Sequence, residues 1–202
     1  MLIKFFLGSS FLVALLVSSV SAECPSKEHV DTGIVLVREP GKNLDDIEYV
    51  SHAGGILAST VDPGANEARR EVYFAHPILP PQGLPDTKWF RSYERKLDSL
   101  DILDSQKKWT SDFVDYPNTD NAQSGSIEVE FQRYRIERVG ACKYRVWDVL
   151  LKESVEGSHA FTERMLYAPE LQMVLRRGVA AGDSLPVLDG GFHQLQIKDD
   201  NS

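Results

Sequence analysis

The sequence predicts an all-β protein of antiparallel strands, arranged as a curved sheet, a sandwich or a partly open barrel. First, apolar residues recur mostly at every second position, which is the period of a half-buried strand. Second, the apolar runs are short and are separated by turn-forming residues such as Gly54-Gly55 and Asp62-Pro63-Gly64. Third, no alternation of strands with helical segments is visible, which argues against a parallel sheet.

The N-terminal segment, residues 1–22, is typical of a secretory signal peptide. Lys4 precedes an apolar stretch, and small residues follow it up to Ala22. The stretch is shorter than the roughly 20 residues that a membrane-spanning helix needs. We therefore expect cleavage after Ala22 and export to the bacterial periplasm or beyond. We also expect one β-rich domain over residues 23–202, without a transmembrane segment in the mature chain.

Short apolar runs predict eight strands outside the central part of the chain. They cover residues 33–38, 47–51, 56–61, 70–75, 109–114, 159–166, 173–177 and 192–198. Four prolines fall within residues 76–86 and predict an extended loop, because proline cannot donate to a sheet ladder.

The central pair of strands has the clearest pattern. In SIEVEFQRYRIERV, residues 126–139, apolar side chains such as Ile127 and Val129 alternate with polar ones. The run CKYRVWDVLLKES, residues 142–154, alternates as well. Because Gly140-Ala141 stands between the two runs, we expect a β-hairpin.

Residues 88–104 admit two interpretations. Their apolar residues fall at helical spacing at Trp89, Tyr93, Leu97, Leu100 and Leu103. The same text also fits a long strand that starts at Lys88 and turns at Asp98-Ser99. Periodicity alone leaves helix and strand open.

The stretch YAPELQMVLRR, residues 167–177, predicts a wide turn between two neighbouring strands. Pro169 has no N–H to donate and pushes Ala168 toward an extended conformation. Tyr167 and Leu171 are expected to pack over the end of the sheet.

This corner, the run 109–125 and the turn 140–144 resemble a group of uncharacterised exported bacterial all-β domains with a Tyr-x-Pro-Glu-Leu corner. The resemblance covers residues 105–178. It implies a C-terminal half of strand, turn, strand, corner and final strand, and it implies no enzyme and no catalytic residues. The chain departs from the group at Gln172, where a Gly commonly follows the Leu.

The two cysteines, Cys24 and Cys142, allow a single intramolecular pairing. In an oxidising compartment we expect them to form a disulfide that ties the mature N-terminus to a strand. Lipidation of Cys24 is disfavoured because Glu23, which is not a small residue, directly precedes it.

The net charge of −8 argues against a nucleic-acid partner and against docking on an anionic membrane. Basic residues do gather in the central hairpin, at Arg133, Arg135, Arg138, Lys143 and Arg145. Glutamates are interleaved with them. We expect a solvated strand face with cross-strand ion pairs, and the alternative is a basic binding patch.

The sequence holds no motif for catalysis, and no cofactor or metal is expected. The histidines are too far apart for a local zinc motif: His29, His52, His76, His159 and His193. A site assembled by the fold, for example His52 with His76 and a carboxylate, stays open. Asp98, Asp101 and Asp104 lack the central Gly and closing Glu of a calcium loop.

Aromatic residues are abundant and are expected to fill the core, although they would also suit an apolar cavity. They are Trp89, Trp109, Trp147, Tyr73, Phe74, Phe90, Phe113, Phe131 and Tyr144. We therefore expect a non-catalytic envelope or periplasmic module that binds a protein partner or an apolar ligand. The alternatives are a secreted hydrolase with a His or carboxylate site assembled by the fold, and a structural protein of a surface assembly.

Overall fold

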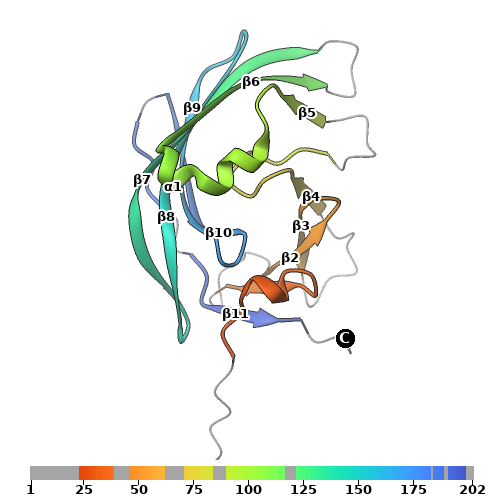
Figure 1. The fold of residues 1–202 in the computed structure, drawn as a ribbon, viewed down its shortest axis with the longest axis vertical. Coiled ribbons are helices and arrows are strands. Elements are labelled where there is room, and N and C mark those ends of the chain that lie inside the picture. Colours follow the sequence, from red (N-terminus) through yellow and green to blue (C-terminus); the bar gives the residue numbers. More distant parts are fainter. Residues whose placement is uncertain are drawn as a thin grey trace, which may run out of the picture.

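The computed structural model describes residues 23–38, 46–61, 71–83, 90–116, 122–182, 184–188 and 191–198. The expected signal peptide and Trp89 lie outside the described residues. The predicted antiparallel all-β fold is confirmed, because the strands form one sheet of five and one of six strands. The sheets do not close into a barrel, and the arrangement is consistent with a β sandwich (Figure 1).

The five-stranded sheet has the order β11-β1-β2-β3-β4, so the last strand of the chain pairs with the first. Its strands are β1 Ile34–Val37, β2 Asp46–His52, β3 Gly55–Val61, β4 Glu71–Phe74 and β11 Gln194–Ile197. Each of them falls within or close to a predicted run. A short 3₁₀ helix, η1 Lys27–His29, precedes β1.

The six-stranded sheet has the order β10-β9-β8-β7-β6-β5 and contains the longest strands, β7 and β8. Its strands are β5 Phe90–Tyr93, β6 Lys108–Tyr116, β7 Gln123–Val139, β8 Cys142–Val155, β9 Phe161–Ala168 and β10 Met173–Ala181. In Figure 1 the curved β7 and β8 run along one side of the molecule, and the five-stranded sheet lies near their lower ends.

The predicted central hairpin is confirmed, and Gly140 adopts the positive φ of 60° that its tight turn requires. The predicted disulfide is present in the structure. The Cα atoms of Cys24 and Cys142 lie 5.6 Å apart, within the ordinary range for such a bridge. It fastens the described N-terminus to the first residue of β8.

Residues 88–104 combine both interpretations. The segment begins as β5, then continues as the 3₁₀ helix η2 Leu97–Ile102 and the single α-helical turn α1 Leu103–Gln106. The inward positions Leu100 and Leu103 of these turns are fully buried against the sheet. The helical spacing therefore applies to the second half of the segment only.

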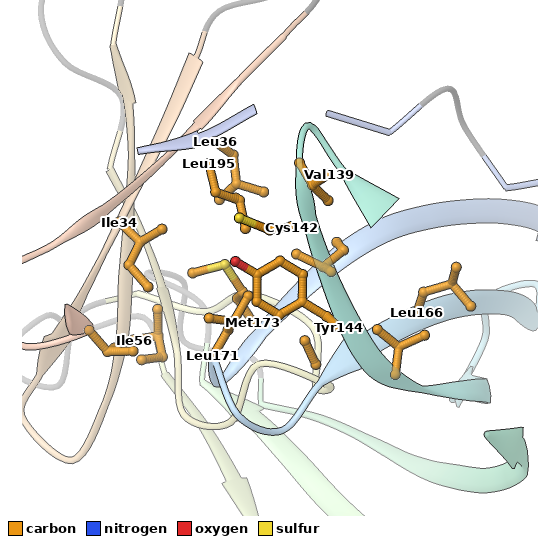
Figure 2. Close-up of a cluster of buried hydrophobic side chains, with 14 of the residues drawn as sticks. Ile34, Leu36, Ile56, Val139, Cys142, Tyr144, Leu166, Leu171, Met173 and Leu195 are labelled. Atoms are coloured by element: carbon orange, nitrogen blue, oxygen red, sulfur yellow. The ribbon is translucent and has the colours of Figure 1, made fainter. Parts of the chain in front are cut away.

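Two hydrophobic clusters lie on opposite faces of β8. Cys142, Tyr144 and Val146 belong to the first cluster, which the five-stranded sheet covers (Figure 2). Val149 and Leu151 belong to the second cluster, which η2 and α1 cover. Since successive side chains of a strand alternate between faces, the six-stranded sheet buries one face at one end and the other face further along.

A β-bulge at Gln132 shifts the register between β7 and β8. Phe131 pairs with Val149, whereas Arg133 already pairs with Asp148. Without the bulge, Arg133 would share a face with Phe131. The bulge therefore moves Arg133 and the residues after it to the opposite face.

The corner before β10 forms as predicted. The N–H of Leu171 donates to the carbonyl oxygen of Ala168 over 3.1 Å, and both Tyr167 and Leu171 are buried. Gln172 takes a left-handed conformation with φ of 50°, which is uncommon for a residue other than Gly.

The proline-rich loop contributes two side chains to the core. Ile78 and Leu79, which stand between Pro77 and Pro80, are fully buried in the second cluster. The N–H of Leu79 closes a turn within the loop by donating to the carbonyl oxygen of His76, and the N–H of Gln82 ties the loop to β4 by donating to the carbonyl oxygen of Tyr73. Its apolar pair therefore serves as part of the core.

Candidate functional site

A polar hollow lies on the face of the six-stranded sheet opposite the second cluster. We call it the outward groove. Its cavity of about 700 Å³ is lined by Glu94, Arg95, Thr110, Ser111, Asp112, Ser126, Ile127, Glu128, Lys152, Glu153, Ser154 and Ala160. The side chains of Thr110, Asp112, Ser126 and Ser154 are exposed, while their neighbours along each strand are buried.

Strand alternation and register bring these side chains together. On β6 and β7, Asp112 pairs with Ser126, which in turn pairs with Ser154 of β8. The next row along the strands joins Thr110, Glu128 and Lys152 in the same way. The polar positions of three strands therefore form parallel rows on one face.

A second hollow of about 430 Å³ continues the outward groove toward the end of β6. It shares Asp112 and Ser126 with the first cavity and adds Val114, Ser124 and Glu156. The whole track therefore follows the strand direction.

An exposed aromatic pair stands beyond this end of the groove. Phe90 of β5 pairs with Tyr116 of β6, and their rings stack with centroids 4.7 Å apart. The side chains are 39% and 40% exposed, respectively. Since Tyr116 is two residues beyond Val114, both aromatic rings lie on the face of the groove. From Thr110 to Tyr116 the track measures roughly 20 Å at the rise of an extended strand.

Acidic residues outnumber basic ones along the track. Glu94, Asp112, Glu128 and Glu156 line it together with the cations Arg95 and Lys152. Outside the cavity, Lys108 contacts Glu128 over 2.6 Å. The groove therefore offers carboxylate acceptors and hydroxyl groups in larger number than cationic donors.

The opposite face of the same strands carries a buried ionic cluster. Arg91 donates to the carboxylates of both Asp115 and Glu153. The guanidinium lies 3.7 Å above the centre of the Phe113 ring. Burial opposes the charge of Arg91, but the hydrogen bonds to the two carboxylates raise its pKa above the ordinary value. This cluster fixes β5, β6 and β8 relative to one another beneath the groove.

A second buried carboxylate lies nearby on β9. Arg177 of β10 contacts Glu163, with Nε and Oε1 2.9 Å apart. Burial raises the pKa of Glu163; the charge of Arg177 opposes the shift and that of Glu153 adds to it. The distance marks an ion pair, although that oxygen lacks a well-directed hydrogen bond.

His76 and His52 do not line the groove. His76 is buried, and its Nε2 lies 3.5 Å from Oδ1 of Asp101. The imidazole of His76 at this distance lowers the pKa of Asp101. Neither residue lines the groove cavities. His52 instead contacts the ring of Tyr73 edge-on.

No group of three or more His, Cys, Asp or Glu side chains that could hold a metal ion occurs among the described residues. Within the same residues, no helix is long and apolar enough to cross a membrane. Of the aromatic residues expected in the core, Phe74, Tyr144, Trp109, Phe113, Phe131 and Trp147 pack into the two clusters, Tyr73 is buried outside them, and Phe90 is exposed. The sequence did not predict that these groove residues form a site, although Thr110, Asp112 and Val114 are the outward-facing residues of a predicted strand.

Comparison with known proteins finds no matching family model and no significant match among curated proteins or solved structures.

Proposed function

We propose that the mature chain is an exported, non-catalytic module that binds a saccharide chain in the outward groove. One observation carries the proposal: a row of hydroxyl and carboxylate side chains ends at the exposed, stacked pair Phe90 and Tyr116. Sugar hydroxyls donate to carboxylates and exchange hydrogen bonds with Ser and Thr. The apolar C–H face of a sugar ring packs against an aromatic ring.

The shape of the groove favours an oligosaccharide over a single sugar. The track from Thr110 to Tyr116 is open and runs for roughly 20 Å along the strands, a length that suits several linked sugar rings better than one. A rigid floor supports such binding, because the Arg91 cluster holds three of its strands together. Preorganisation of this kind lowers the entropic cost of binding.

Export is part of the same proposal. The disulfide between Cys24 and Cys142 supports an oxidising compartment, in which such bridges persist. The pattern of residues 1–22 supports secretion. A periplasmic or extracellular site would place the groove among envelope polysaccharides.

Other ligands have less support from the described residues. An apolar ligand would need an apolar cavity, whereas both hollows of the groove are lined mainly by polar residues. A hydrolase built on the His76 and Asp101 pair would act outside the groove, and a carboxylate hydrolase within the groove is an outcome of the test below. Protein partners remain an outcome of the test below.

Isothermal titration calorimetry with β-1,4-linked tetrasaccharides of glucose and of N-acetylglucosamine tests the proposal. Tyr116→Ala and Asp112→Asn should each weaken binding by roughly tenfold, since each removes one contact of about 1.4 kcal/mol. Tyr134→Ala is a matched control, because Tyr134 is 41% exposed and lies away from the groove. Asp98→Asn is the matched acidic control.

Absence of binding to both tetrasaccharides, or equal binding by groove and control variants, would overturn the proposal. Mass spectrometry of the recovered sugars tests the non-catalytic part separately. Intact tetrasaccharides are expected. Shortened chains would assign the groove to a hydrolase, and copurification of a protein that Asp112→Asn abolishes would assign it to a protein partner.

A further inference from the structure

Three arginines converge on one buried carboxylate next to the bulge of β7. Arg164 of β9 donates from Nε and Nη2 to the two oxygens of Asp148, over 2.8 and 2.7 Å. Arg133 donates from Nε over 3.4 Å, and Nη1 of Arg135 lies 3.6 Å from the same carboxylate. Asp148 itself is only 1% exposed.

The bulge at Gln132 creates this convergence. It turns Arg133 and Arg135 onto the face of Asp148, whereas unbroken alternation would direct them to the opposite face. Register then sets Arg133 directly opposite Asp148. Bulges recur at positions where a strand redirects a side chain toward a site.

The cluster carries surplus positive charge. Three guanidinium groups face a single carboxylate. The nearest acids of β7 have other partners, since Glu130 contacts Lys108 and accepts from the amide of Gln132, and Glu137 pairs with Arg176. The carboxylate of Asp148 therefore neutralises only part of the positive charge, and the cluster still attracts a further anion.

Most N–H donors of two of the arginines are also unused. A guanidinium has five N–H groups in a planar fork. Among the described residues, Arg133 makes one long contact and Arg135 makes one ion pair, both to Asp148. Arg164 is occupied by its two-pronged contact and serves to hold Asp148 in place.

A hollow of about 250 Å³ opens at this cluster. It is lined by Gln132, Arg133, Asp148, Leu150, Arg164 and Leu185. Leu185 is 63% exposed and gives the hollow an apolar rim. The hollow thus combines cationic donors, an amide and an apolar border at a scale that suits a small ligand.

We infer that this hollow binds the phosphate group of a phosphate monoester. Its principal ligands are Arg133, which lines the hollow, and Arg135, which lies outside the lining but contacts the same Asp148 carboxylate. The fork of a guanidinium matches phosphate oxygens in pairs, and two such groups suit a doubly charged anion. The apolar rim contacts the organic part of the ester. The site lies on the same face as the outward groove but shares no lining residue with it, so it stands independently of the proposed function.

Nuclear magnetic resonance titration of the mature chain with inorganic phosphate and with glycerol phosphate, at constant ionic strength, tests this inference. Shifts should concentrate at residues 132–135, 148–150 and 164. The variant Arg133→Gln/Arg135→Gln should bind both probes roughly tenfold or more weakly, because two charge-assisted hydrogen-bonding groups are removed. Stronger binding of the ester would assign a role to Leu150 and Leu185.

The matched control is Arg138→Gln/Lys143→Gln, which removes the same charge from the same hairpin. Arg138 and Lys143 pair with each other on the opposite face. This control should retain phosphate binding. An equal loss of phosphate affinity in both double variants would mean that only net charge matters, and it would overturn the inference. Chemical shift changes confined to residues outside the cluster would overturn it too. So would a lack of phosphate binding by the wild-type chain.

Discussion

Arg91 on β5 donates two hydrogen bonds of 2.9 Å to the carboxylate of Glu153 on β8, across the intervening strands β6 and β7. The side chain spans this distance by lying over the ring of Phe113. Gly125 of β7 leaves the space that this ring occupies, since a Cβ there would collide with Phe113. This ion pair therefore joins β5 to β8 beneath the groove, across the two strands between them.

Replacement of Arg91 should destabilise the fold strongly. Arg91→Ala leaves the buried carboxylate of Glu153 without its cation, which costs about 3–5 kcal/mol in comparable sites. Urea unfolding measures the loss. Arg95→Ala removes an exposed cation that lies just after β5 in the chain. It should change the free energy of unfolding by less than about 0.5 kcal/mol. Similar losses in the two variants would contradict the assigned role.

Gly125→Ala tests the space beneath Phe113. The added methyl group meets both the ring of Phe113 and the carbonyl oxygen of Ser154, and overpacking of this kind costs about 1–3 kcal/mol. Ser126→Ala, at the adjacent exposed position, should be nearly neutral. Thermal unfolding of the two variants compares them, and a neutral Gly125→Ala would show that the ring moves aside freely.

Asp148 should make stability depend on pH in the acid range. Burial alone would raise its pKa, but the hydrogen bonds from Arg164 and Arg133 and the charge of Arg135 leave the pKa below its ordinary value. A carboxyl group with a lower pKa in the folded state stabilises the fold above its unfolded pKa of about 3.9. The contribution is lost as pH falls through the folded pKa.

The variant Asp148→Asn checks this dependence. It should be less stable than the wild type at neutral pH, because three arginines lose their counterion. The difference should shrink as the pH falls below about 3.9. Unfolding curves over a pH series give the result, and a difference that stays constant with pH would contradict it.

The disulfide should contribute substantially to stability, because it closes a loop with a sequence separation of 118. Cys24→Ser/Cys142→Ser should lose about 2–5 kcal/mol in free energy of unfolding. Reduction of the wild-type chain should produce a similar loss. If neither treatment changes the urea midpoint, the bridge has no stabilising role.

The fold class and most strands were predictable because alternation, turns and the single cysteine pairing are local signals. The bulge in β7 was not predicted, although the sequence carries a sign of it. Apolar residues stand at odd positions through Phe131 and then at the even positions Tyr134 and Ile136, which is a change of phase within one strand. That change decides which arginines meet Asp148.

The groove and the ionic clusters were beyond prediction from one sequence for a different reason. Arg91 and Glu153 are separated by 62 residues, and their contact depends on strand order. Within the hairpin, the ion pair of Arg133 with Asp148 is of the cross-strand kind that was expected. The contact of Arg164 with Asp148 comes from β9, outside the hairpin, and was not expected. Register among distant strands determines both sites.

Saccharide binding in the outward groove is tested most directly by a nuclear magnetic resonance titration of the mature chain with the tetrasaccharide that binds best in calorimetry. Chemical shift changes are expected along one track, at Thr110, Ser126, Ser154 and Tyr116. Residues on the other face of the sheet, such as Ile136, should be unchanged. Shifts confined to another surface, or no shifts at saturating sugar, would contradict saccharide binding in the outward groove.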